Sequence, residues 1–187
     1  MQSKNSVTIK IFITSIILIL IFALLFWEYF HGGVPSHHIL QQKDLPEISN
    51  WWGAMLLPAL TWILLGRIEK RLNKQDTLNQ QIINPFFKII GLFLLGLTLG
   101  ISIVVSFTNN YYYFLDNVPY VFLVFSLVFP LHYSEFILGF IIGMTYTFGV
   151  LLPTIFILII VALGFLIYRF IRPLIFRITK FSGIYKT

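Results

Sequence analysis

Histidine and carboxylate side chains gather at the end of the first long apolar segment. The run Trp27-Glu28-Tyr29-Phe30-His31 continues into Gly32-Gly33-Val34-Pro35-Ser36-His37-His38, so three of the chain's 4 histidines lie close together. Nitrogen and oxygen ligands without sulfur suit zinc, iron or manganese. Ionisable groups at a bilayer boundary are costly unless they pair, bind an ion or take part in chemistry. The spacing predicts a metal site on the external side, with the candidate ligands Glu28, His31, His37, His38 and Asp116.

A second polar pair, His132 and Glu135, repeats the spacing of Glu28 and His31 in reverse order. Residues three apart share one face of a helix, so each pair can offer an imidazole and a carboxylate to one ion. Di-iron bundles use Glu-x-x-His in this way, but their two further glutamate-donating helices have no counterpart here. The alternative for the first pair is two side chains that extend to the interface, and for His37 and His38 a solvated loop.

The elements that must position these groups are membrane helices. Of 187 residues, 58% are hydrophobic and 11% charged, against about 25% charged in a soluble domain. The absence of cysteine excludes disulfides and thiolate metal sites. The basic residues lie beside apolar runs, where they set topology, so the charge of +6 gives no indication of nucleic-acid binding. Composition predicts an all-α integral membrane protein of the cell membrane, a single polytopic helical bundle.

Apolar run lengths predict about six spans, some short. They cover residues 11–30, 48–66, 86–108, 118–134, 136–150 and 152–170. Gly149 and Pro153 indicate a break between the last two. The basic segments 67–85 and 171–187 are expected in the cytoplasm, which leaves 31–47 as the external loop and both termini inside. The rival topology has a re-entrant piece and a single crossing after Thr108.

Within the external loop, Asp44-Leu45-Pro46-Glu47 resembles a helix capping box, and Ser49 or Asn50 is a further candidate cap of the second span. Asp116 is the lone carboxylate of the second external loop. His132 and Glu135, in contrast, are expected at the cytoplasmic side. This topology separates them from His31 and argues against one site formed by both pairs.

Other residues predict contacts with lipid and between helices. The tryptophans Trp27, Trp51, Trp52 and Trp62 suit an interfacial belt. The tail residues Arg169, Arg172, Arg177 and Lys180 alternate with apolar residues and suit anchoring on anionic lipid headgroups. Glycines in Gly91-x4-Gly96-x3-Gly100 and Gly139-x3-Gly143 predict close helix packing, either within the bundle or with a second copy or partner subunit.

Three functional hypotheses follow. The first is a metal-dependent membrane enzyme that activates water against a lipid-like substrate. The second is a small transporter, channel or pH-responsive component in which histidine protonation switches a state. The third is a non-catalytic accessory subunit of a membrane complex. Metal content and the effect of His→Ala substitutions distinguish them.

Overall fold

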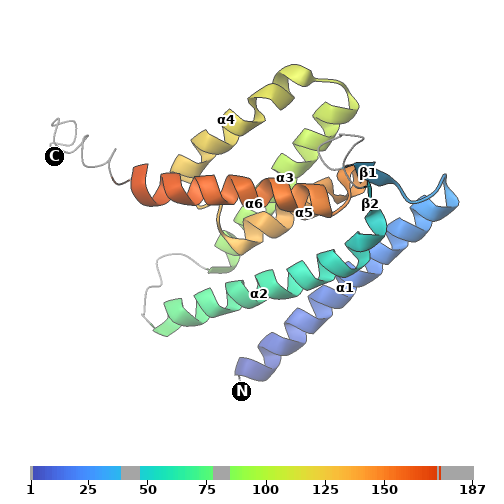
Figure 1. Cartoon of the computed structure of the whole chain (residues 1–187). Helices are drawn as coiled ribbons and strands as arrows, with labels where there is room; N and C mark the ends of the chain where they lie inside the picture. The colour runs from blue at the N-terminus through green and yellow to red at the C-terminus, as the bar shows by residue number, and fades with distance from the viewer. Residues whose placement is uncertain (1, 39–46, 78–84, 172, 174–187) are drawn as a thin grey trace.

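The computed structural model describes residues 2–38, 47–77, 85–171 and 173, and most of them are helical (Figure 1). In chain order the elements are α1 (Gln2–Phe30), β1 (Ser36–His38), β2 (Glu47–Ser49), α2 (Gly53–Thr77), α3 (Pro85–Thr108), α4 (Tyr112–Val128), α5 (Ser134–Phe148) and α6 (Leu151–Leu166). A 3-10 turn, Asn50–Trp52, leads into α2, and a π-helical turn, Ile167–Ile171, follows α6.

Helix occupies part of each of the six segments that the apolar runs single out. Three helical stretches, Ser6–Phe30, Asn50–Lys74 and Pro85–Thr108, are long and apolar enough to cross a membrane. The helices α5 and α6 are apolar but shorter. At 1.5 Å per residue, the 15 residues of α5 extend over about 22 Å, less than the roughly 30 Å of a bilayer's hydrocarbon core. Among the described residues the fold is thus helical, with three helices long and apolar enough to cross a membrane.

The first two long helices lie side by side and antiparallel (Figure 1). Near the start of α1, the Lys10 ammonium lies 2.6 Å from the Glu69 carboxylate near the end of α2. The same ammonium lies 5.3 Å from the centre of the Trp62 ring. These contacts fix which ends of α1 and α2 meet.

Glycines join α3 to α5 in the closest helix contact of the described structure. A Cβ added at Gly96 would lie 2.2 Å from the Phe136 carbonyl oxygen, and one at Gly139 would lie 2.1 Å from the Phe93 carbonyl oxygen. In the same manner, Gly100 on α3 packs against the backbone of α5, and Gly143 on α5 packs against the backbone of α3. The predicted packing role is confirmed within the chain for these four glycines, because only a residue without a side chain allows this approach. It is not confirmed for Gly91, where an added Cβ would meet nothing within 4 Å.

The short helix α5 forms the centre of the molecule, in contact with α2, α3 and α6. Its residues from Ser134 to Ile141 are all buried. Phe136 and Phe140 join Phe122 of α4 and Phe156 of α6 in an aromatic cluster, with Phe122 and Phe140 centroids 5.5 Å apart. Aromatic edge-to-face pairs of this kind add to the burial of apolar area.

The predicted break after α5 is confirmed at Gly149. This residue ends the helix with a φ of +68°, a conformation that favours glycine. Pro153 lies in the first turn of α6, where its missing N–H costs nothing. A Cβ at Gly149 would also lie 2.1 Å from the Asn50 side-chain oxygen, so the break packs against the start of α2.

An antiparallel pairing of β1 with β2 replaces part of the expected loop. Ser36 pairs with Ser49, His37 with Ile48 and His38 with Glu47. The capping-box prediction is wrong at Glu47, which is in a strand instead of a first helical turn; Asp44 lies outside the described residues. Ser49 is the cap, since its hydroxyl accepts a hydrogen bond from the Trp51 backbone N–H.

Candidate functional site

The two predicted histidine–carboxylate pairs lie at opposite ends of the described structure. We call the region of β1, β2, the end of α1 and the α5–α6 break the hairpin end. The basic cluster is the group Arg67, Arg71, Lys88, His132, Tyr133 and Glu135 at the opposite end of α5. Glu135 and Phe148 are separated by about 20 Å along the helix axis. As the topology predicts, His132 and Glu135 do not join His31.

At the hairpin end, His31 bonds to its own helix. The Nδ1 atom donates to the Trp27 carbonyl oxygen at 2.8 Å, and the ring stacks on the Trp27 indole with centroids 3.8 Å apart. A carbonyl oxygen only accepts, so Nδ1 carries the proton and the neutral ring keeps a lone pair on Nε2. Glu28 is half-buried, and its Oε2 atom has no hydrogen-bond partner among the described residues.

The strand pairing brings the second part of the predicted metal site toward a carboxylate. His38 stands opposite Glu47 in the strand register, and the Ser36 hydroxyl donates to the Glu47 carboxylate. The side chains of His37 and His38 lie outside the described part of the structure. Within that part, no group of three or more His, Asp and Glu side chains is arranged to hold a metal ion. The metal site therefore stays a prediction.

Asp116 lies on a helix and not in a loop, which corrects its expected position. Helix α4 begins at Tyr112, so Asp116 falls in its second turn, where it is exposed. The uncharged run that predicts this span begins only at Val118, after Asp116. In the structure the helix begins earlier, at Tyr112.

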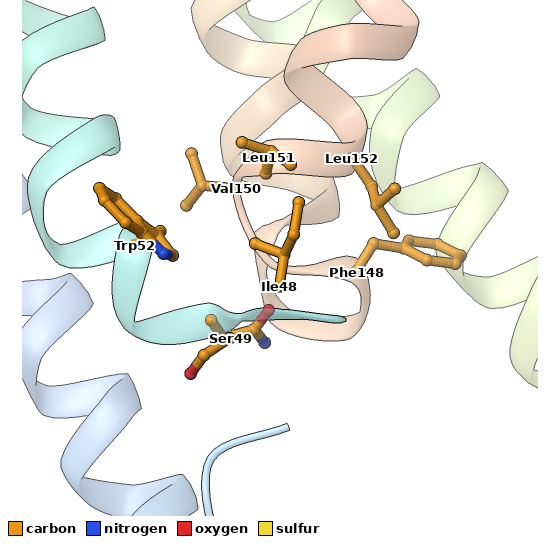
Figure 2. Close-up of a pocket in the computed structure, with 9 residues that line it drawn as sticks. Ile48, Ser49, Trp52, Phe148, Val150, Leu151 and Leu152 are labelled. Carbon is orange, nitrogen blue, oxygen red and sulfur yellow. The ribbon is translucent and has the colours of Figure 1, made fainter. Parts of the chain in front are cut away.

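A small pocket lies within the hairpin end, between β2 and the α5–α6 break. Its lining includes Ile48, Ser49 and Trp52 near the hairpin and Phe148, Val150, Leu151 and Leu152 around the break; in Figure 2 Ile48 lies between Trp52 and Phe148. Its volume of about 10 Å³ is roughly that of one water molecule. The pocket is a packing gap at the hairpin end, too small for a lipid-like substrate.

The basic cluster contains the most deeply buried charge among the described residues. Glu135, in the first turn of α5, is 0% exposed, and its Oε1 atom lies 2.6 Å from an Nη atom of Arg71 on α2. The Arg71 side chain keeps 22% of its surface. The Glu135 Oε2 atom is buried without a hydrogen-bond partner among the described residues. A pair of this kind holds α2 to α5 but leaves one carboxylate oxygen unsatisfied, which is costly in a low-dielectric environment.

The aromatic ring of Tyr133 is a common contact of two cations in the basic cluster. The Arg71 guanidinium lies 4.1 Å from the centre of its ring, and the Lys88 ammonium from α3 lies 5.3 Å from the same centre. Both distances are within the range of cation–π attraction. One ring therefore brings together cations from two helices that are distant in sequence.

His132 packs edge-on against Tyr133, with centroids 4.9 Å apart, and against Phe165 of α6. Burial lowers the pKa of the His132 imidazole below its ordinary value, the charges of Arg71 and Arg67 lower it further, and Glu135 acts in the opposite direction. The ring is thus held neutral near pH 7, beside a carboxylate that would bind its charged form.

Sequence reasoning identified His132 and Glu135 but missed Arg71, Tyr133 and Lys88. Arg71 and Glu135 are 64 positions apart, and no periodicity links them. One signal was available, because a lone carboxylate in an apolar helix needs a cation and the basic segment 67–85 supplies several.

Of the residues expected at the membrane interface, Trp27, Trp51, Trp52 and Trp62 are all exposed, as a belt requires. Arg169 is exposed in the π-helical turn after α6. Arg172, Arg177 and Lys180 lie outside the described residues.

Comparison of the chain with protein-family models, curated proteins and solved structures finds no match.

Proposed function

We propose that the chain is a pH-responsive component of the cell membrane, of the small transporter or channel type, and that the basic cluster is its working site. The observation that carries the proposal is the fully buried Glu135 carboxylate, paired with Arg71 next to His132. Buried ionisable residues in membrane helices mark ion and proton pathways or gates. In this account the protein has six spans with both termini in the cytoplasm, which puts the basic cluster at the cytoplasmic face.

The proposed response is an exchange of partners at Glu135. When His132 binds a proton, it becomes a second cation that competes with Arg71 for the carboxylate, and it repels Arg71 and Arg67 on α2. The other charged group at the site is Lys88 on α3, whose ammonium lies over the Tyr133 ring. Phe165, the α6 contact of His132, carries no charge. The end of α2 is therefore expected to move away from the α4–α5 turn at acidic pH.

A distance measurement tests this response. Spin labels are introduced at Lys74→Cys on α2 and Phe129→Cys before α5, both exposed positions, in a chain that has no native cysteine. In proteoliposomes, the label separation should increase between pH 8 and pH 5. The same pair in His132→Gln is the control and should not change. Equal separations at both pH values in the wild-type background would overturn the proposal.

The six-span topology has its own test. A cysteine at Lys74 should react with an impermeant thiol reagent only from the cytoplasmic side, and a cysteine at Tyr113 only from the outside. Both positions are exposed, so the reaction reports sidedness and not burial. Labelling of both from one side would contradict the crossing between them and with it the six-span topology.

A metal-dependent membrane enzyme acting on a lipid-like substrate is the second candidate function, and the hairpin end favours it. The Nδ1 bond to Trp27 orients His31 as metal-binding histidines are oriented, with Nε2 left for an ion. The pairing of His38 with Glu47 adds an imidazole and a carboxylate to the same end. Zinc, iron or manganese would then be held by side chains among Glu28, His31, His37, His38 and Asp116.

Mass spectrometry of the purified protein tests the metal directly. The enzyme proposal expects close to one zinc, iron or manganese ion per chain, lost in a His31→Ala, His37→Ala, His38→Ala variant that stays folded. Absence of metal in the wild-type protein after incubation with all three ions would remove this candidate.

A further inference from the structure

The basic cluster has more positive charge than its described partners neutralise. Among the described residues the ion pairs are Lys10–Glu69 and Arg71–Glu135. Arg67 and Lys88 are exposed and have no carboxylate partner in that part of the chain. Arg71 is thus paired with Glu135, whereas Arg67 on α2 and Lys88 on α3 keep a positive charge that no described carboxylate compensates.

The arrangement of these cations suits a single anionic group. The Arg71 guanidinium and the Lys88 ammonium both lie against the Tyr133 ring, at 4.1 Å and 5.3 Å from its centre. Arg67 precedes Arg71 by four residues in α2, so the two share a helix face. Arg71 gives one N–H to Glu135 and, of its five N–H groups, keeps others for a further acceptor.

The surroundings of the cluster point to the source of that group. Phe86 and Phe87 at the start of α3, next to Lys88, and Ile63 on α2, one turn before Arg67, are large, apolar and exposed. Apolar side chains next to unpaired cations at a helix end are suited to a lipid, whose chains lie along the helices while its phosphate meets the cations. A free phosphate ion has no apolar part that could contact these side chains.

We propose that Arg71 and Lys88 on the Tyr133 ring, together with Arg67 one turn before Arg71, form a binding site for the phosphate headgroup of an anionic phospholipid. The inference rests on the proposed function for the placement of this end at the cytoplasmic leaflet. The lipid phosphate fills the site between α2 and α3 and supplies the negative charge that Glu135 alone does not provide. It is a site distinct from the basic tail, because its cations come from α2 and α3.

The test is a lipid titration at constant pH 7.5, with the full chain in neutral detergent and bound lipid counted by native mass spectrometry. Phosphatidylglycerol is the probe, and phosphatidylcholine is the lipid control with the same phosphate but no net charge. The Arg67→Gln and Lys88→Gln variants should each weaken phosphatidylglycerol binding about fivefold, the effect of one basic residue at an anionic surface. Lys88→Arg should restore binding.

Lys70→Gln is the matched control. It removes the same charge from the same helix, and its charge acts on Glu69, whereas the cations that contact the Tyr133 ring are those of Arg71 and Lys88. Unchanged binding in this variant, with weakened binding in the other two, supports the site. Equal weakening in all three would show unspecific charge attraction and overturn it. Equal binding of phosphatidylcholine, or of inorganic phosphate at the same concentration, would also overturn it.

This experiment and the test of the pH response fail independently. Lipid binding is measured at one pH with His132 intact, whereas the label separation depends on His132 and a change of pH. If the protein binds phosphatidylglycerol but the label separation does not change with pH, the lipid site stands and the proposed function is wrong.

Discussion

At the hairpin end the polar side chains Ser36, Glu47 and His31 lie at the surface, whereas at the basic end Glu135 is fully buried against Arg71. Backbone pairing between β1 and β2 shapes the first region, and side-chain contacts between α2, α3 and α5 shape the second. Exposed polar groups are solvated and contribute little to stability. A buried pair depends on both members, because removal of one leaves an uncompensated charge. The two ends should therefore respond very differently to substitution.

The largest effect is expected from Arg71→Met. The variant leaves Glu135 buried without a cation, which should lower the free energy of unfolding by about 3–5 kcal/mol. Denaturant unfolding in detergent measures the loss. The double variant Arg71→Met, Glu135→Met should recover most of it, because no buried charge remains. Wild-type stability in the single variant would show that the pair does not hold α2 to α5.

Gly139→Ala tests the contact that keeps α5 fixed between the two ends. The new methyl group would overlap the Phe93 carbonyl oxygen, so the α3–α5 contact must open, at a cost of about 1–3 kcal/mol. Gly91→Ala is the control on α3, since nothing lies within 4 Å of an added Cβ there. In thermal unfolding, the Gly139→Ala variant should have a clearly lower melting temperature than the Gly91→Ala variant. Similar melting temperatures would argue against the glycine contact.

A smaller effect is expected from pH, and only through the basic end. The pKa of His132 is lowered in the folded protein, so below its ordinary value of about 6.5 the unfolded chain binds the proton more readily. The His132 contribution therefore lowers stability as the pH falls from about 6.5 toward the folded pKa and is absent above that window. His132→Gln should reduce this slope in unfolding experiments at pH 5 to 8. An unchanged slope would contradict the burial of His132.

The smallest effect is expected at the hairpin end. Ser36→Ala removes the hydrogen bond to Glu47, but both residues are exposed and water replaces the bond. The stability change should stay within about 0.5 kcal/mol in the same denaturant assay. A loss of several kcal/mol would place a key structural contact at the hairpin end and cancel the contrast between the two regions.

The helices were predictable from sequence because long apolar runs dictate them locally. The break at Gly149 and the close packing at Gly96 and Gly139 were also predictable, since glycine has a specific use at each position. The β1–β2 pairing was missed because strands of three residues are too short for an alternating pattern. In addition, β2 follows β1 only after residues 39–46, so no local pattern links the two strands.

The basic cluster was predictable only in part. His132 and Glu135 stood out as polar residues between apolar segments, but their contacts come from α2 and α3. The approach of Arg71 to Glu135 depends on how α2 packs on α5, which local patterns do not encode. The same limit applies to Lys88, whose basic charge was interpreted only as a signal of membrane topology.

The most direct test of the account compares both ends in one preparation of proteoliposomes. One label pair, Lys74→Cys with Phe129→Cys, reports on the basic end. A second pair, Trp51→Cys with Tyr146→Cys, reports on the hairpin end, at exposed positions of the 3-10 turn before α2 and of α5. Between pH 8 and pH 5, the account predicts a longer separation for the first pair and no change for the second. Movement at the hairpin end with a fixed basic end would contradict it.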